Sequence, residues 1–228
     1  MRVPTNSKQE PTLEEEIALL SQGYSFIAGL DEAGRGPLAG PVVAAAVILR
    51  LSDFNECLTC FAGVRDSKQV TAQAREHLYE VIMRHALAVG IGTGSVEMID
   101  EINILQATKH AMRVALTQLV IHPHALLLDA VSLPEIELPQ RSIIKGDELC
   151  LSISAASIIA KVTRDRMMIQ LHEEYPVYGF AQHKGYGTEA HLAALRQHGA
   201  CPHHRRSFAP VREVFDLPPS PKEQKADA

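Results

Sequence analysis

Residues 26–41, FIAGLDEAGRGPLAGP, decide the fold, because an apolar strand here runs into two carboxylates and a glycine-bracketed arginine. The segment from Phe26 to Leu30 predicts a short buried strand, which the following glycines and prolines end, letting the backbone approach a ligand. Binding sites in open α/β sheets lie at such strand ends. Asp31, Glu32 and Arg35 are therefore candidates for holding metal ions and a phosphate together, the alternative being a solvated charged turn.

Length and composition indicate one globular unit. The chain has 228 residues, 46% of them hydrophobic, which is enough for a substantial core with or without an appended lobe. No run of about 18 apolar residues could span a bilayer, and the first 16 residues are polar where a signal peptide is apolar. We expect a cytoplasmic protein with no membrane partner, and a monomer. Cys57 and Cys60 lack further ligands at zinc-site spacing and are expected to be reduced thiols.

Charge is distributed unevenly along the chain. The net charge is −5, yet residues 161–212 contain eight Lys or Arg against four Asp or Glu, with six histidines besides. A carboxylate-rich front half and a basic back half suit a site in which acids hold cations and bases hold phosphates. A basic, solvated surface is the alternative interpretation.

The order of the predicted elements indicates an α/β fold with a mixed sheet flanked by helices. The first strand and residues 42–49 should form an antiparallel pair, and residues 125–128 lack polar alternation, as in a strand covered on both faces. The other predicted strands are 88–96 and 141–145, and the predicted helices are 71–85, 102–121, 150–172 and 189–198 with a short final helix. Residues 1–22 are expected to be a polar arm, and the Pro- and Lys-rich segment 217–228 a disordered tail.

Four carboxylates carry the expected chemistry. Asp129 follows the apolar strand 125–128, where an unpaired carboxylate would be costly to bury, so it joins Asp31 and Glu32 as a metal-ligand candidate. Mg²⁺ and Mn²⁺ prefer oxygen ligands and need no Cys or His. Asp147, in Lys145-Gly146-Asp147, could equally be a helix N-cap on sequence grounds alone.

Together these segments resemble the signature of the ribonuclease HII family, the type 2 ribonucleases H of bacteria. The resemblance extends from about Tyr24 to about Val214. It implies a ribonuclease H-like fold for a catalytic domain of residues 23–216, with a C-terminal helical lobe from about residue 173. Further matching motifs are Asp66-Ser67-Lys68, residues 154–165 (SAASIIAKVTRD), residues 183–188 (HKGYGT) and residues 204–208 (HRRSF).

The resemblance also implies roles for individual residues. Asp31, Glu32 and Asp129 match the family's metal-binding acids, and Asp147 matches its fourth catalytic carboxylate. The family uses its Gly-Arg-Gly loop, here Gly34-Arg35-Gly36, to read the ribonucleotide. One departure is Ala130, where glycine commonly follows the aspartate.

Three further residues are substrate-binding candidates. Tyr186 matches the tyrosine that stacks on the neighbouring deoxyribose and senses an RNA-to-DNA junction. Lys68 and Lys161 are candidates for phosphate contacts, although each alone could be a solvated lysine. The hydroxyls and cations of residues 204–208 are also of the types that contact phosphates.

The implied activity is that of a metal-dependent endonuclease. It would hydrolyse the RNA strand of RNA/DNA hybrids and cut 5′ of single ribonucleotides in duplex DNA by two-metal, in-line water attack. Products would carry 3′-hydroxyl and 5′-phosphate ends, and the role would be ribonucleotide removal. Two rivals are a ribonuclease HIII, for whose larger N-terminal domain the segment before Tyr24 is expected to be too short, and a non-catalytic hybrid-binding protein.

Overall fold

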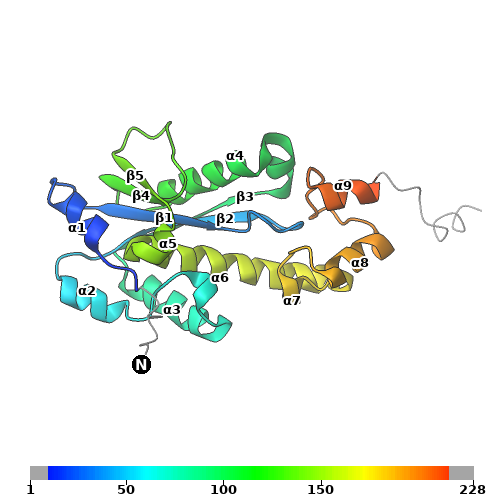
Figure 1. Ribbon diagram of the computed structural model, residues 1–228, viewed down its shortest axis with the longest axis horizontal. Helices are drawn as coiled ribbons and strands as arrows, with labels where there is room; N and C mark the ends of the chain where they lie inside the picture. Colours follow the sequence, from blue (N-terminus) through cyan, green and yellow to red (C-terminus); the bar gives the residue numbers. More distant parts are fainter. Residues whose placement is uncertain (1–9, 216–228) are drawn as a thin grey trace, which may run out of the picture.

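A mixed five-stranded sheet forms the centre of the computed structural model, which describes residues 10–215 (Figure 1). The strand order is β3-β2-β1-β4-β5; β1 runs antiparallel to β2 and parallel to β4. The predicted antiparallel pair and the predicted mixed α/β sheet are therefore confirmed. The strands are β1 (Ile27–Ala33), β2 (Val42–Ile48), β3 (Ala88–Gly94), β4 (Ala125–Asp129) and β5 (Gln140–Ile143).

Helices cover both faces of this sheet, which is why β2 is buried at every position. In Figure 1, α4 runs along one face and α6 along the other, while α7, α8 and α9 lie toward one end of α6. The helices are α1 (Glu14–Leu20), α2 (Phe54–Cys60), α3 (Ala72–His85), α4 (Val96–Thr117), α5 (Gly146–Leu149), α6 (Leu151–Glu174), α7 (Phe180–His183), α8 (Glu189–His198) and α9 (Ala209–Phe215), with 3₁₀ turns at Ser67–Gln69 and Pro176–Tyr178.

Two of the helices differ from expectation for local reasons. Helix α4 begins at Val96 rather than residue 102, because the Ser95 side chain accepts a hydrogen bond from the Met98 amide and caps it. Asn103, with φ of 67°, interrupts the helix and breaks its apolar periodicity. The short helix α2 was not predicted; Asp53 caps it by accepting from the Asn55 and Glu56 amides.

Helix α6 crosses β1 at very short range. A Cβ atom on Gly29 would lie 2.3 Å from the backbone carbon of Ser152, so only glycine permits this approach. The close crossing brings the α6 side chains that follow, including Ser157 and Lys161, beside the end of β1 where Asp31 lies.

Residues 10–22, expected as part of a polar arm, instead pack against the body of the molecule. Leu13 and Leu19 are buried, and the fully buried Glu16 accepts hydrogen bonds from the Ser152 amide at 2.9 Å and its hydroxyl at 2.7 Å. Glu16 thus satisfies the start of α6, which has no side-chain cap of its own. This part of the arm expectation is wrong. Residues 1–9 and the expected tail 217–228 lie outside the described residues.

Candidate active site

The predicted acids of the two central strands meet at neighbouring strand ends. Leu30 of β1 pairs with Leu128 of β4, and Asp31 and Asp129 each come directly after that pair. Parallel strands end at the same edge of a sheet, so both carboxylates reach one cavity, together with that of Glu32.

This cavity contains every predicted site residue except Asp147. Its volume is about 270 Å³, and it opens between the strand ends, α6 and the loop before α8. Besides the three acids, its lining includes the predicted substrate-binding residues Gly34, Arg35, Gly36, Lys68, Lys161 and Tyr186. Ser67, Ser157 and Arg164 complete its polar lining.

Asp147 lies beside the cavity and is connected to it by hydrogen bonds. The Lys68 ammonium donates to Asp147 Oδ2 at 3.1 Å, and the Gly146 amide donates to Asp129 Oδ1 at 2.8 Å. The Ser154 hydroxyl donates to the Asp147 backbone carbonyl at 2.7 Å. Asp147 lies in the first turn of α5, whose N-cap position is occupied by Lys145, so the alternative N-cap role is wrong.

Burial and mutual repulsion shift the carboxylates toward their protonated forms. Burial raises the pKa of Asp31 well above its ordinary value, and the charges of Glu32 and Asp129 raise it further. Burial also raises the pKa of Glu32, against the opposing effect of Arg35. The pKa of Asp129 is raised by burial and then by Asp147. A cation among these groups would relieve the repulsion.

Two cationic side chains partly neutralise the acids. The Arg35 guanidinium lies 3.2 Å from Glu32 Oε1, and Lys68 contacts Asp147 while most of its side chain stays exposed. Burial opposes the charge on Lys68, but its hydrogen bond to Asp147 prevails and its pKa is raised. Lys161 is instead paired with Asp165 at 2.7 Å, and burial lowers its pKa.

The acidic side of the cavity has the donor chemistry of a hard divalent cation. All its anionic donors are carboxylate oxygens, and Glu32 Oε2 is buried without a hydrogen-bond partner. Within residues 10–215, no three acidic, histidine or cysteine side chains already converge as a finished metal site. The residues fit Mg²⁺ or Mn²⁺, provided that the side chains now paired with Arg35 and Lys68 can turn toward the ion.

Tyr186 borders the cavity from the loop before α8. It lies between Gly185 and Gly187, and its side chain is 47% exposed although it lines the cavity. A Cβ on Gly36 would lie 3.7 Å from its ring, so the ring borders the Gly34-Arg35-Gly36 loop. The Tyr186 carbonyl accepts a hydrogen bond from His191 Nδ1 at 2.9 Å, which ties the loop to α8.

Part of the phosphate-contact expectation for residues 204–208 is wrong. His204 and Arg205 are 1% and 0% exposed and hydrogen-bond inside the protein, so they cannot meet a nucleic acid at the surface. This burial could not be predicted from the residue types, since a run of basic residues normally indicates a solvated surface.

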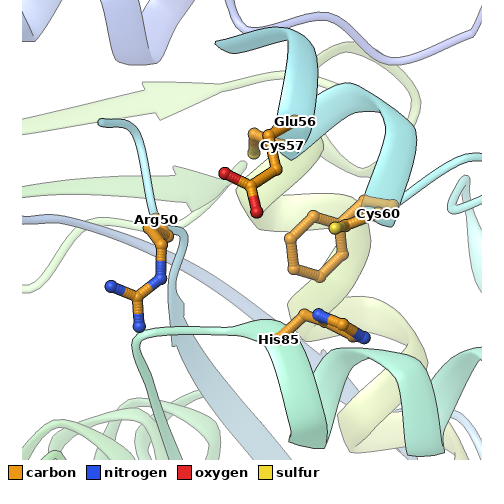
Figure 2. Close-up of a pocket in the computed structure, with 6 residues that line it drawn as sticks. Arg50, Glu56, Cys57, Cys60 and His85 are labelled. Atoms are coloured by element: carbon orange, nitrogen blue, oxygen red, sulfur yellow. The ribbon is translucent and has the colours of Figure 1, made fainter. Parts of the chain in front are cut away.

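The Cys57 and Cys60 pair lies apart from this cavity. Figure 2 shows both cysteines of α2 near Arg50, Glu56 and His85 around a second, smaller pocket. Burial raises the pKa of Cys57 to about 11, so it stays a thiol at neutral pH. In the described part of the chain, no three candidate ligands converge here on a metal position either.

Comparison with known proteins decides the family. A family model described as Ribonuclease HII matches residues 28–211. The chain belongs to the ribonuclease HII family. A ribonuclease HII of Acidovorax sp. (strain JS42) is 56% identical over 211 residues, which cover 92% of this chain and 98% of that protein. Membership makes the chain an endoribonuclease, a ribonuclease H of type 2, rather than a non-catalytic binding protein.

Solved structures confirm the ribonuclease H-like fold. The ribonuclease H2 from Pyrococcus horikoshii OT3 matches with a TM-score of 0.70 at 28% identity, covering 84% of this chain and 97% of that one. Bst-RNase HIII, solved in complex with Mn²⁺, matches with a TM-score of 0.64 at 21% identity, covering 84% and 69%, and supports the fold alone. Among residues 10–215, no helix of this chain combines the length and apolar character needed to cross a membrane.

Proposed function

We propose that this chain hydrolyses the RNA strand of RNA/DNA hybrids and cuts 5′ of single ribonucleotides embedded in duplex DNA. The observation that carries the proposal is that three carboxylates, the Gly34-Arg35-Gly36 loop and Tyr186 line one cavity. Acids that can hold cations and groups that can read a sugar must lie together if cleavage is to occur at a ribonucleotide.

The acidic residues hold the cofactor in this proposal. Asp31, Glu32 and Asp129, with Asp147 beside them, are the proposed ligands of Mg²⁺ or Mn²⁺, and the Mn²⁺ complex of the related Bst-RNase HIII is consistent with this choice. Two such ions, when bound, would activate a water for in-line attack and stabilise the leaving oxygen. The expected products carry 3′-hydroxyl and 5′-phosphate ends.

The opposite wall of the cavity recognises the substrate. The ribose 2′-hydroxyl is the group that distinguishes RNA from DNA, and the backbone at Gly36 can approach it without a Cβ in the way. The missing Cβ of Gly34 makes room instead for the buried Arg164 side chain. The half-exposed Arg35 side chain can leave Glu32 for a phosphate, and Tyr186 can stack on the next sugar. Lys68 and Lys161 are proposed to bind phosphates of the same duplex.

This activity serves the removal of ribonucleotides from DNA. The proposed partners are RNA/DNA hybrids and ribonucleotide-containing duplexes, the proposed active form is a monomer, and the proposed location is the cytoplasm. Supporting the nucleic-acid assignment, eight Lys or Arg occur against four Asp or Glu in residues 161–212, which contribute Lys161 and Tyr186 to the cavity.

The test is cleavage of three end-labelled duplexes: an RNA/DNA hybrid, a DNA duplex with one ribonucleotide, and the same duplex with deoxyribose at that position. The proposal requires metal-dependent cutting of the first two, with a 3′-hydroxyl left on the 5′ side of the single ribonucleotide. If only the hybrid is cut, the proposed activity on embedded ribonucleotides is wrong. If the all-deoxy duplex is cut, the proposed recognition of the ribose is wrong.

A further inference from the structure

Two buried arginines beneath the substrate-binding wall have no carboxylate partner. Arg164 and Arg205 are 1% and 0% exposed, and no ion pair to either occurs within residues 10–215. Burial lowers the pKa of Arg205 to about 9 and that of Arg164 to about 10, yet both stay charged at neutral pH. Burying a charged side chain without a counter-ion costs stability. The groups that accept the hydrogen bonds of these two arginines should therefore show why they are buried.

The Arg205 guanidinium donates hydrogen bonds to backbone carbonyls in and just after the Gly34-Arg35-Gly36 loop. Its Nη2 donates to the Gly34 carbonyl at 2.6 Å, and its Nη1 donates to the Arg35 carbonyl at 2.9 Å. Its Nε and Nη2 donate to the Gly40 carbonyl at 3.0 and 2.9 Å. The planar guanidinium fork therefore holds both ends of the loop at once.

The segment that carries Arg205 is itself fixed. The Arg205 amide donates to the Leu38 carbonyl at 2.9 Å, and the Gly40 amide donates to the His203 carbonyl at 2.9 Å. Asp100 of α4 accepts hydrogen bonds from the amides of the two following residues at 2.9 Å each. A guanidinium held this firmly can set the orientation of the peptides that it contacts.

These carbonyl contacts also fix the direction in which the neighbouring amide N–H groups point. The described chain contains no cis peptide bond, so each amide N–H points opposite to the carbonyl of its own peptide unit. The Gly34 carbonyl shares its peptide with the Arg35 amide, and the Arg35 carbonyl shares its peptide with the Gly36 amide. Because both carbonyls face the buried Arg205, both amides face away from it.

The side away from Arg205 is the cavity. Gly34 is buried, Arg35 and Gly36 are exposed, and all three line the cavity, whereas Arg205 does not. Within residues 10–215, neither the Arg35 amide nor the Gly36 amide donates to a protein acceptor. The two amides are thus available to a ligand in the cavity.

We propose that Arg205 is a positioning residue for substrate recognition, which turns the Arg35 and Gly36 amides toward the ribonucleotide at the cleavage site. The proposal rests on the proposed function, in which this loop reads the ribose and its phosphate. Arg205 touches no substrate and acts only through the loop. A lysine cannot replace it, because an ammonium group does not reproduce the planar fork that holds several carbonyls together.

Cleavage kinetics test the consequence for the substrate. The variants are Arg205→Lys and Arg205→Met, measured on the duplex with one ribonucleotide. The control is Ile82→Ala, which truncates a fully buried side chain of α3 in the core and destabilises the protein away from the loop. We expect KM to rise about tenfold in both Arg205 variants with a much smaller change in kcat, since amide donors are lost while the carboxylates stay in place.

Nuclear magnetic resonance tests the loop independently of activity. The chain has 14 glycines, so labelling glycine alone with nitrogen-15 gives a simple amide spectrum, and Gly36→Ala identifies the Gly36 signal. The Gly36 signal should shift or broaden in Arg205→Lys and Arg205→Met and stay in place in Ile82→Ala. The lysine variant preserves the test if the methionine variant does not fold.

The outcomes separate the two proposals. An unmoved Gly36 signal, or a loss of kcat with KM unchanged in both Arg205 variants, overturns the positioning role. A wild type that cuts neither ribonucleotide substrate overturns the proposed function instead, and the Gly36 signal still decides whether Arg205 orients the loop.

Discussion

The acidic and basic walls of the cavity both contain buried charges of one sign, but they differ in whether protein groups already compensate those charges. On the acidic wall, Asp31, Glu32 and Asp129 are buried together and their pKa values are raised. The basic wall consists of Arg164, which lines the cavity, and Arg205, which lies behind the Gly34-Arg35-Gly36 loop. Both arginines are buried with lowered pKa values, and backbone carbonyl oxygens accept hydrogen bonds from their guanidinium groups. The basic wall is therefore complete as it stands, whereas the acidic wall is completed by cations from solution.

The largest effect is expected from a substitution that removes one carboxylate of the acidic wall. Asp31→Asn removes one anionic ligand while keeping the shape of the side chain, so cleavage of the single-ribonucleotide duplex should fall by about a hundredfold or more. Initial rates with saturating Mg²⁺ or Mn²⁺ measure this. Cleavage that persists at the wild-type rate would show that the metal assignment is wrong.

A second prediction concerns the C-terminal helices, where acid should weaken the fold. His191 and His204 are buried with their Nε2 atoms 3.0 Å apart, and burial lowers the pKa of His204 to about 4. The unfolded chain takes up a proton near pH 6.5 but the folded chain does not, so stability should decline by about 3 kcal/mol as the pH falls from 6.5 to 4. Denaturant unfolding of wild type and His204→Gln checks this, and the same pH slope in both would contradict it.

The acidic wall should respond to pH with the opposite sign. Because the pKa of Asp31 is raised in the folded state, its charge costs stability above the pKa of the unfolded chain, and that cost is relieved as the pH falls. At neutral pH, Asp31→Asn should therefore stabilise the protein and raise its Tm. Thermal melting at two pH values measures this, and an Asn variant that melts below wild type at neutral pH would refute it.

The smallest prediction concerns the turn that follows Asp129. Ala130 has a φ of 49°, in the left-handed region, where an alanine side chain is strained and glycine is not. Ala130→Gly should stabilise the protein by about 0.5 kcal/mol, because the relief of strain is partly offset by the greater freedom of glycine in the unfolded chain. Equilibrium unfolding in denaturant measures the free energy of unfolding of both proteins. A lower value for Ala130→Gly than for wild type would contradict the prediction.

The acidic wall was open to prediction because its signals are local. An apolar run without polar alternation indicates a strand covered on both faces, and a carboxylate at its end, as at Asp31 and Asp129, stands out against it. The predicted helices 71–85 and 189–198 are likewise present as α3 and α8, and the structure shows Thr71 and Thr188 capping them through their side-chain oxygens.

The basic wall was not open to prediction because its contacts span the chain. Arg205 and the Gly34 carbonyl are 171 residues apart in sequence, and Glu16 and Ser152 are separated by 136. From the sequence alone, a charged residue is predicted to lie at the surface, because backbone partners that are distant in the chain cannot be identified. The same reason made residues 10–22 look like a polar arm.

Equilibrium binding of Mn²⁺, followed through the electron paramagnetic resonance signal of the free ion, tests most directly whether the acidic wall gathers cations. Wild-type protein should bind Mn²⁺ without nucleic acid, and Asp31→Asn should bind it about tenfold or more weakly. Equal affinity in the two proteins would contradict the assignment of Asp31 as a metal ligand and, with it, the account of how the two walls work together.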